Sequence, residues 1–122
     1  MSLNWKEAIS VYESMSEAAK AQLLGDLCFN LTIDFRIIAG EPTVTQSGLE
    51  KLQGINEIQH HALGQMLKYQ QVDPKRYSDR DFFRSMFRMA KNYGLAGQVQ
   101  RSLMAGLQKP GSLAQSDPTA TT

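Results

Sequence analysis

The chain has 122 residues, of which 13 are basic and 12 are acidic, giving a formal net charge of +1 at neutral pH. Hydrophobic residues account for 42% of the sequence, which is enough for the core of a single domain. No stretch approaches the roughly 18 consecutive apolar residues of a membrane-spanning helix, so that class of membrane protein is excluded. Strand-forming residues are few and do not alternate with polar ones. The sequence therefore predicts an all-α fold, a small bundle of about five helices with two long antiparallel helices at its centre.

The beginning of the chain and its cysteine content indicate a compartment. Residues 1–6 lack the charged and then apolar layout of a secretory signal peptide. Cys28 is the only cysteine, so no internal disulfide can form, and both observations predict a cytoplasmic protein. Cys28 falls on the flank of an apolar helix face, which favours a buried, unreactive thiol over a nucleophile.

Capping residues mark the first two helices. Asn4 is predicted to cap a short helix over residues 5–13. The S-x-x-E spacing from Ser14 to Glu17 is that of a capping box and predicts a long helix over residues 16–39. Gly40 is then expected to end this helix, because glycine is the usual residue just beyond a helix C-terminus.

The second helix carries apolar residues on two of its sides. Its main stripe consists of Leu24, Leu27, Leu31, Phe35 and Ile38. A second patch on the far side consists of Phe29, Ile33 and Ile37. A helix that is apolar on two faces is normally covered on both. The helix therefore either runs through the middle of the bundle or uses its second patch to contact another protein, including a second copy of this chain.

A second S-x-x-E spacing, from Ser47 to Glu50, predicts a capped third helix over residues 48–71. Its expected core face consists of Leu49, Leu52, Ile55, Ile58, Ala62, Leu63, Met66, Leu67 and Tyr69. The opposite face consists of Glu50, Gly54, Glu57, His61, Gly64 and Lys68. Each glycine inside a helix costs about 1 kcal/mol relative to alanine. This face is therefore predicted to receive another helix, from this chain or from a second copy, or else to be a solvated face that tolerates glycine.

Polar residues on the two long helices form a candidate small-ligand or metal site. The set consists of Asn30, Asp34, Asn56, Gln59 and His60. Gln59 lies near the middle of the apolar face, where an amide either bonds to a neighbouring helix or faces a polar pocket. Asp34 is expected to pair with Arg84, Arg88 or His60.

The E-x-x-H spacing of Glu57 and His60 places two possible metal ligands on one helix. Di-iron bundles need this spacing twice, together with further glutamates, and here it occurs once. We therefore predict no metal ligands. The expectation is a half-buried His60 and an exposed pair of Glu57 with His61.

Two helices are predicted to close the bundle. Ser78 and the acidic residues after it open a helix that ends at Tyr93. A final helix is expected over residues 95–109. The small and polar residues 110–122 predict a disordered tail, so the expected domain covers residues 1–109.

Charge is distributed unevenly along the chain. Residues 1–66 hold four basic and eight acidic residues, whereas residues 67–122 hold nine basic and four acidic residues. Four of the basic residues form a stripe at helical spacing, namely Arg80, Arg84, Arg88 and Lys91. Such a stripe is the pattern expected for contact with nucleic-acid phosphates, and it is equally the pattern of an ordinary solvated helix face.

No motif of a reaction class is present. The sequence contains no glycine-rich phosphate loop, no nucleophile elbow and no metal-spaced cluster of cysteine and histidine. We therefore expect no catalytic residue, no cofactor and a non-enzymatic protein-interaction module that forms a homodimer or binds another protein. The alternatives are the small-ligand or metal site between the long helices and nucleic-acid contact through the basic stripe.

Overall fold

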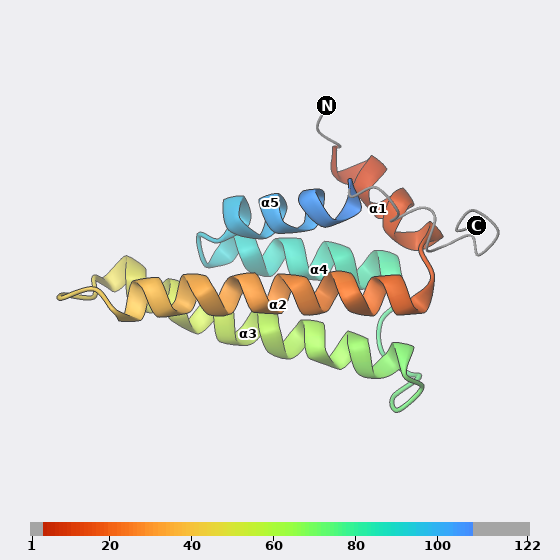
Figure 1. Cartoon of the computed structure of the whole chain (residues 1–122), viewed down its shortest axis with the longest axis horizontal. Coiled ribbons are helices and arrows are strands. Elements are labelled where there is room, and N and C mark those ends of the chain that lie inside the picture. Colours follow the sequence, from red (N-terminus) through yellow and green to blue (C-terminus); the bar gives the residue numbers. More distant parts are fainter. Residues whose placement is uncertain (1–3, 109–122) are drawn as a thin grey trace.

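The computed structural model describes residues 4–108 and contains five α-helices, with no strand in that range (Figure 1). The helices are α1 (Trp5–Ser14), α2 (Glu17–Ala39), α3 (Gln46–Tyr69), α4 (Asp79–Asn92) and α5 (Ala96–Leu107). This confirms the predicted all-α fold. The predicted tail at residues 110–122 lies outside the described residues. Among residues 4–108, no helix is long and apolar enough to cross a membrane.

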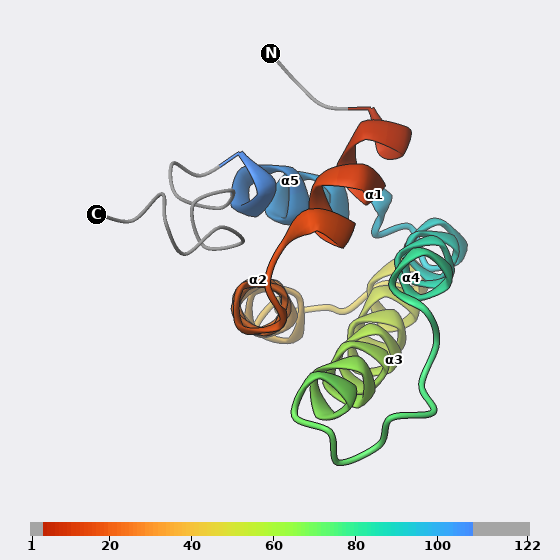
Figure 2. The same cartoon turned by 90° about the vertical axis from the view of Figure 1, so that its right-hand side faces the viewer.

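The two long helices, α2 and α3, pack against each other in antiparallel directions, as predicted (Figure 1). Seen along these helices, α2 and α4 lie on opposite sides of the bundle, with α3 below them and α5 and α1 above (Figure 2). α4 and α5 join at a tight corner where Gly94 adopts a φ of +71°, a left-handed conformation that favours glycine.

Two of the predicted capping boxes are wrong, although both helices begin within two residues of the predicted positions. α3 is capped by Thr45, whose hydroxyl accepts a hydrogen bond from the Gly48 backbone N–H at 3.0 Å, so the predicted capping box at Ser47 does not form. Threonine and serine are both suitable capping residues. The start at Gln46 places Gly48 against the side chains of Ile38 and Val44. α2 is capped by Ser16 rather than by Ser14.

The core lies where α1, α4 and α5 cover the inner sides of α2 and α3. Its largest fully buried side chains are Tyr12, Phe82, Phe83, Leu24, Leu27, Leu31, Ile55, Ile58, Met86, Leu95, Leu103 and Gln65. Leu49 and Leu63, which were predicted as core residues of α3, are 52% and 51% exposed. The core face of α3 is therefore narrower than the apolar face of its helical wheel, because neighbours cover only part of it.

Candidate functional site

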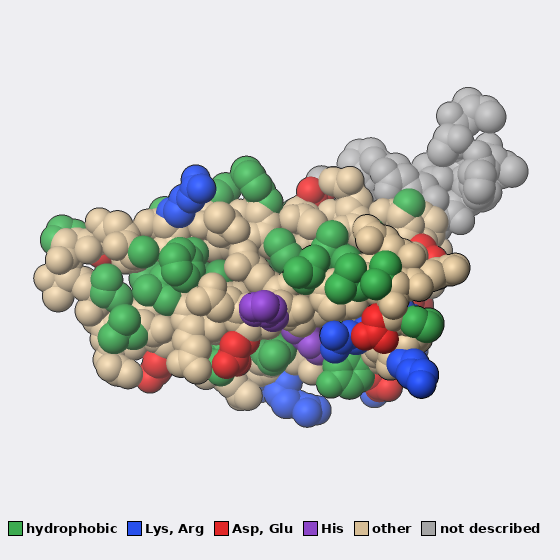
Figure 3. All heavy atoms as spheres, turned by 90° about the horizontal axis from the view of Figure 1, so that it is seen from below, with side chains coloured by type: hydrophobic (Ala, Val, Ile, Leu, Met, Phe, Trp, Pro, Cys, Tyr) green, Lys and Arg blue, Asp and Glu red, His purple; other side chains and the backbone are tan. Residues whose placement is uncertain are grey.

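The second apolar patch of α2 is exposed. Phe29 is 67% exposed, Ile33 43% and Ile37 61%, whereas Leu27 and Leu31 of the main stripe are buried. Figure 3 shows hydrophobic side chains gathered in several groups over the face that α2 and α3 form, on both sides of a histidine near its middle. We refer to Phe29, Ile33 and Ile37 as the outer strip of α2.

Contacts on either side of α2 explain why the outer strip stays uncovered. On one side, Asn30 donates a hydrogen bond to the Ser102 hydroxyl of α5 at 2.8 Å. On the other side, Gln59 of α3 donates to the Cys28 carbonyl at 2.8 Å and to the Thr32 hydroxyl at 2.9 Å. The outer strip lies between these two contact lines. Ile33 borders the groove beside α5, and all three side chains of the strip remain at least 43% exposed among residues 4–108.

The glycine-bearing face of α3 is in contact with this chain itself. A Cβ added at Gly54 would lie 2.4 Å from the Cβ of Tyr93 and 2.9 Å from a methyl carbon of Leu95. The predicted close approach is therefore made by the corner between α4 and α5. Gly64 lies against the guanidinium of Arg76 in the same way. The candidate interface residues on α3 are consequently occupied within the chain.

The two histidines have exchanged their expected environments. His60 is exposed, whereas the His61 ring is half-buried and stacks on Phe82 with 4.8 Å between ring centroids. Burial lowers the pKa of His61, a contact with the Phe82 backbone opposes this, and the positive charge of Arg76 lowers it further, so the net pKa is below its usual value. The expected Glu57–His61 pair does not form, because the Glu57 carboxylate accepts a hydrogen bond from the Tyr93 hydroxyl.

The structure does not bring the five residues of the candidate ligand site together. Asn30 and Asp34 line a groove of about 340 Å³ beside α5, together with Gln98 and Arg101. Asp34 is therefore directed toward α5 and not toward Arg84 or Arg88 of α4.

The other three members lie on the opposite side of α2. Asn56, Gln59 and His60 line a separate shallow hollow of about 160 Å³ with Leu63. The hydrogen bonds of Gln59 to α2 give this residue a packing role. Among residues 4–108, no three histidine, cysteine, aspartate or glutamate side chains are grouped so that they could hold a metal ion.

A buried polar network that sequence reasoning missed joins four of the helices. The Lys20 side chain of α2 is 8% exposed, and its ammonium lies 2.5 Å from the carboxylate of Asp79 at the start of α4. Tyr69 of α3 donates a hydrogen bond to the same carboxylate at 2.9 Å. The hydroxyls of Tyr12 in α1 and Tyr69 also share a hydrogen bond. Because Tyr69 donates to Asp79, Tyr12 donates to Tyr69.

The protonation of this network follows from its burial. Burial of the Asp79 carboxyl raises its pKa, but hydrogen bonds from Lys20 and Tyr69 and the charges of Lys20 and Lys68 lower it more, so the net pKa is below its usual value. Burial raises the pKa of both Tyr12 and Tyr69, so these hydroxyls stay protonated. The network is thus a lysine–aspartate ion pair held by neutral donors.

One sequence signal could have located Lys20. It precedes Leu24, Leu27 and Leu31 by four, seven and eleven residues, which places a lysine in line with the buried leucine stripe. A lysine at such a position needs a counter-charge, because an unpaired buried charge is strongly unfavourable. No pattern in the sequence identifies Asp79 as that partner, since acids in a first helical turn are common.

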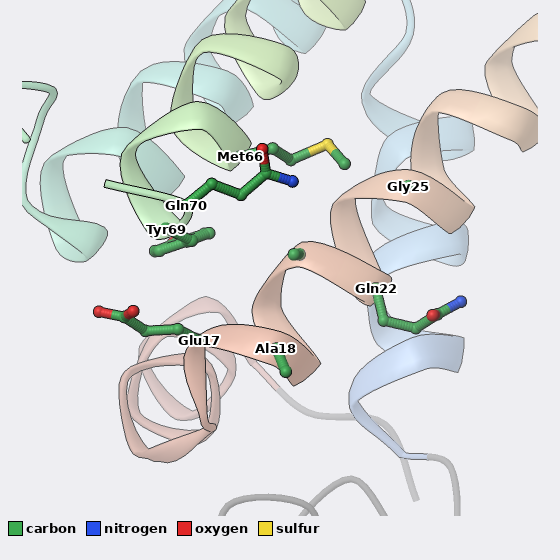
Figure 4. A pocket seen from close by; sticks show the side chains of 8 residues that line it. Glu17, Ala18, Gln22, Gly25, Met66, Tyr69 and Gln70 are labelled. Carbon is green, nitrogen blue, oxygen red and sulfur yellow. The ribbon is translucent and has the colours of Figure 1, made fainter. Parts of the chain in front are cut away.

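A groove of about 650 Å³ opens beside this network, between the first turns of α2 and the last turns of α3 (Figure 4). In Figure 4, Gln70 and Met66 lie on one wall, Glu17 and Ala18 on the other, and Tyr69 between them. Glu17 is the only charged residue that lines this groove.

The basic stripe lies on the outer side of α4, and all four of its residues are exposed. Arg80 is bound by Glu13 of α1, with 2.9 Å between the guanidinium nitrogen and the carboxylate oxygen. Among the described residues, Arg84, Arg88 and Lys91 form no ion pair.

Comparisons with known proteins add no relative. No protein family, curated protein or solved structure matches the chain. The surfaces of the molecule are therefore the guide to its function. Two of them stand out, namely the outer strip of α2 and the basic stripe of α4.

Proposed function

We propose that this protein is a non-enzymatic helical module that self-associates through the outer strip of α2. The observation that carries the proposal is that α2 is apolar on two sides and covered on one. Phe29 and Ile37 are each more than 60% exposed in the chain alone. Contiguous exposed apolar side chains on a folded protein typically mark an interaction surface.

A second copy of the same chain is the partner that this surface fits best. A twofold dimer brings the same patch of both chains together, so the patch must be complementary to itself. An uncharged apolar strip meets this condition, because no charge on it opposes an identical charge on the partner. Phe29, Ile33 and Ile37 are all uncharged.

The charges that flank the strip support an antiparallel arrangement of two α2 helices. Phe29 and Ile33 lie two residues on either side of Leu31, and Asp26 and Arg36 lie five residues on either side of it. A twofold axis at the level of Leu31 would therefore place Phe29 opposite Ile33 of the second copy. The same axis would place Asp26 opposite Arg36, which pairs opposite charges.

The mass in solution, measured by light scattering at two protein concentrations, tests this function. We expect a dimer for the natural protein and a monomer for Ile33→Arg, because the new charge would be buried against the apolar Phe29 of the second copy without a counter-charge. Helical content should be unchanged, since Ile33 is 43% exposed.

Val72→Arg is the matched control. Val72 is 67% exposed in the loop after α3, so the substitution adds the same charge at an apolar position away from the strip. This variant should remain a dimer. A natural protein that is monomeric at both concentrations would refute the proposal. Unfolding of Ile33→Arg would instead make Ile33 an ordinary core residue, and Phe29→Arg would then decide between the two explanations.

A further inference from the structure

The outer side of α4 has a composition unlike that of any other exposed helix face in the described residues. Its exposed residues are Arg80, Asp81, Arg84, Arg88, Lys91 and Asn92. Four of these six are basic, and none is apolar. The inner side carries Phe82, Phe83, Met86 and Ala90, all of them buried. The core therefore fixes the rotation of α4 and keeps its cations directed outward.

The acidic residues of α4 do little to offset this charge. The Asp79 carboxylate is already paired with the ammonium of buried Lys20 at 2.5 Å, which leaves Asp81 as the one exposed acid of the helix. Arg80 is bound by Glu13, but Arg84 and Arg88 lie one and two turns further along and have no such partner among residues 4–108. The outer face is therefore a net positive surface.

We propose that the outer face of α4 binds the phosphate backbone of double-stranded DNA without reading the base sequence. Residues 80, 84 and 88 are spaced about 6 Å apart along the helix axis, and residues 80 to 91 span about 16 Å. α4 lies on the side of the bundle opposite α2 (Figure 2), and the four basic residues of its outer side are exposed. The major groove of B-form DNA, about 12 Å wide, admits a single α-helix, with phosphates along both edges. The row of cations along the exposed side of α4 matches these rows of phosphates.

Other linear or flat polyanions fit the face less well. Proteins that bind single-stranded nucleic acid provide aromatic side chains for base stacking, whereas Phe82 and Phe83 are buried and Phe87 packs on Trp5 with 3.8 Å between ring centroids. A membrane-surface helix inserts apolar side chains beside its cations, and α4 exposes none. The deep and narrow major groove of A-form RNA does not admit side chains in this way.

Fluorescence anisotropy with a labelled duplex of arbitrary sequence, measured at several salt concentrations, tests this inference. We expect binding in the range of about 10⁻⁴ to 10⁻⁶ M, typical of non-specific DNA contacts, that weakens steeply as salt rises. In the double variant Arg84→Gln, Arg88→Gln, the slope of log affinity against log salt should fall by about 2, because each lost phosphate contact removes about one unit.

Two further variants sharpen the test. Arg101→Gln removes the same charge from an exposed site on α5. This variant should keep the slope of the natural protein, whereas Arg88→Gln alone should lower it. Glu13→Gln removes the acid that binds Arg80 and should strengthen DNA binding, because it releases a further cation. Equal losses in Arg88→Gln and Arg101→Gln would overturn the proposal, because net charge rather than the stripe would then govern binding.

The choice of partner is tested by competition. A single-stranded oligonucleotide, polyglutamate or vesicles of anionic lipid that displace the duplex at equal charge concentration would overturn the assignment to DNA. Binding that does not respond to salt would also overturn it. The inference is independent of self-association, so the monomeric Ile33→Arg variant should bind a short duplex as tightly as the natural protein does.

Discussion

Lys20 and Asp79 show how much of the fold depends on single polar residues. Their ion pair connects α2 to the start of α4, and the bonds to Tyr69 and Tyr12 extend it to α3 and α1. Removing two charges from water is costly, and a buried pair contributes chiefly when further hydrogen bonds satisfy it. Here Gln65 also donates to the Asp79 carboxylate, at 3.3 Å. Loss of the Asp79 charge would leave the buried Lys20 ammonium unpaired, whereas Asp79 also has Lys68 within 3.6 Å.

The Asp79→Asn variant is therefore expected to lose about 2–4 kcal/mol of folding free energy at neutral pH, since Lys20 would keep its charge without a counter-ion. The pKa of Asp79 is lower in the folded than in the unfolded chain, so the folded state binds fewer protons here. The stabilisation is thus complete above the unfolded pKa of about 3.9 and is lost as pH falls below it toward the folded pKa. Urea unfolding between pH 7 and pH 2.5 measures this.

Asp73→Asn is the control for this experiment, because its pair with Arg76 is about half exposed on both sides. It should change stability by less than about 1 kcal/mol. The pKa of His61 is lowered in the folded chain, so protonation of His61 destabilises the fold as pH falls through about 6.5. This effect is common to all variants and cancels when they are compared. An Asp79→Asn protein as stable as Asp73→Asn at pH 7 would show that the network contributes nothing.

At the scale of single elements, the glycines of α3 and α2 illustrate what helix patterns can and cannot predict. The glycine-bearing face predicted a close approach at Gly54, and Tyr93 makes it. The pattern could not decide whether the approaching segment belongs to this chain, because a helical wheel specifies a face and not its neighbour. The start of α3 was misplaced for a related reason, since Thr45 and Ser47 are both good capping residues.

Alanine substitutions at two glycines should have opposite effects. Gly54→Ala should destabilise the fold by about 1–3 kcal/mol, because its Cβ would overlap Tyr93 and overpacking outweighs the gain in helix propensity. Gly25→Ala should stabilise it by up to about 1 kcal/mol, since its nearest neighbour would be the Met66 methyl at 3.9 Å. Thermal unfolding of the two variants measures both effects. Destabilisation by Gly25→Ala would contradict this expectation, because it would mean that the added methyl group is not accommodated beside Met66.

At the scale of the whole molecule, periodicity in the sequence was sufficient for the helix plan but not for the surfaces. Apolar residues at helical spacing predicted the five helices and the antiparallel pair. The five residues of the candidate ligand site are not brought together, because Asn30 and Gln59 bond on opposite sides of α2, an arrangement set by where α5 packs. The exposure of Phe29 likewise depends on tertiary packing, because the wheel alone allowed this side to be buried.

The twofold symmetry proposed for the dimer couples Asp26 and Arg36, two charges that lie ten residues apart in one chain. In the antiparallel arrangement Asp26 of each copy lies opposite Arg36 of the other, so each contact occurs twice. Arg36→Asp or Asp26→Arg alone should weaken the dimer by about 5- to 30-fold, because two attractive contacts at the rim become repulsive. The double variant Asp26→Arg, Arg36→Asp should restore most of the affinity, since the contacts are re-formed with their signs exchanged.

The dimer dissociation constants of all four proteins can be measured by sedimentation equilibrium. A double variant as weak as the product of the two single effects would exclude the antiparallel register, because the two positions would then be independent.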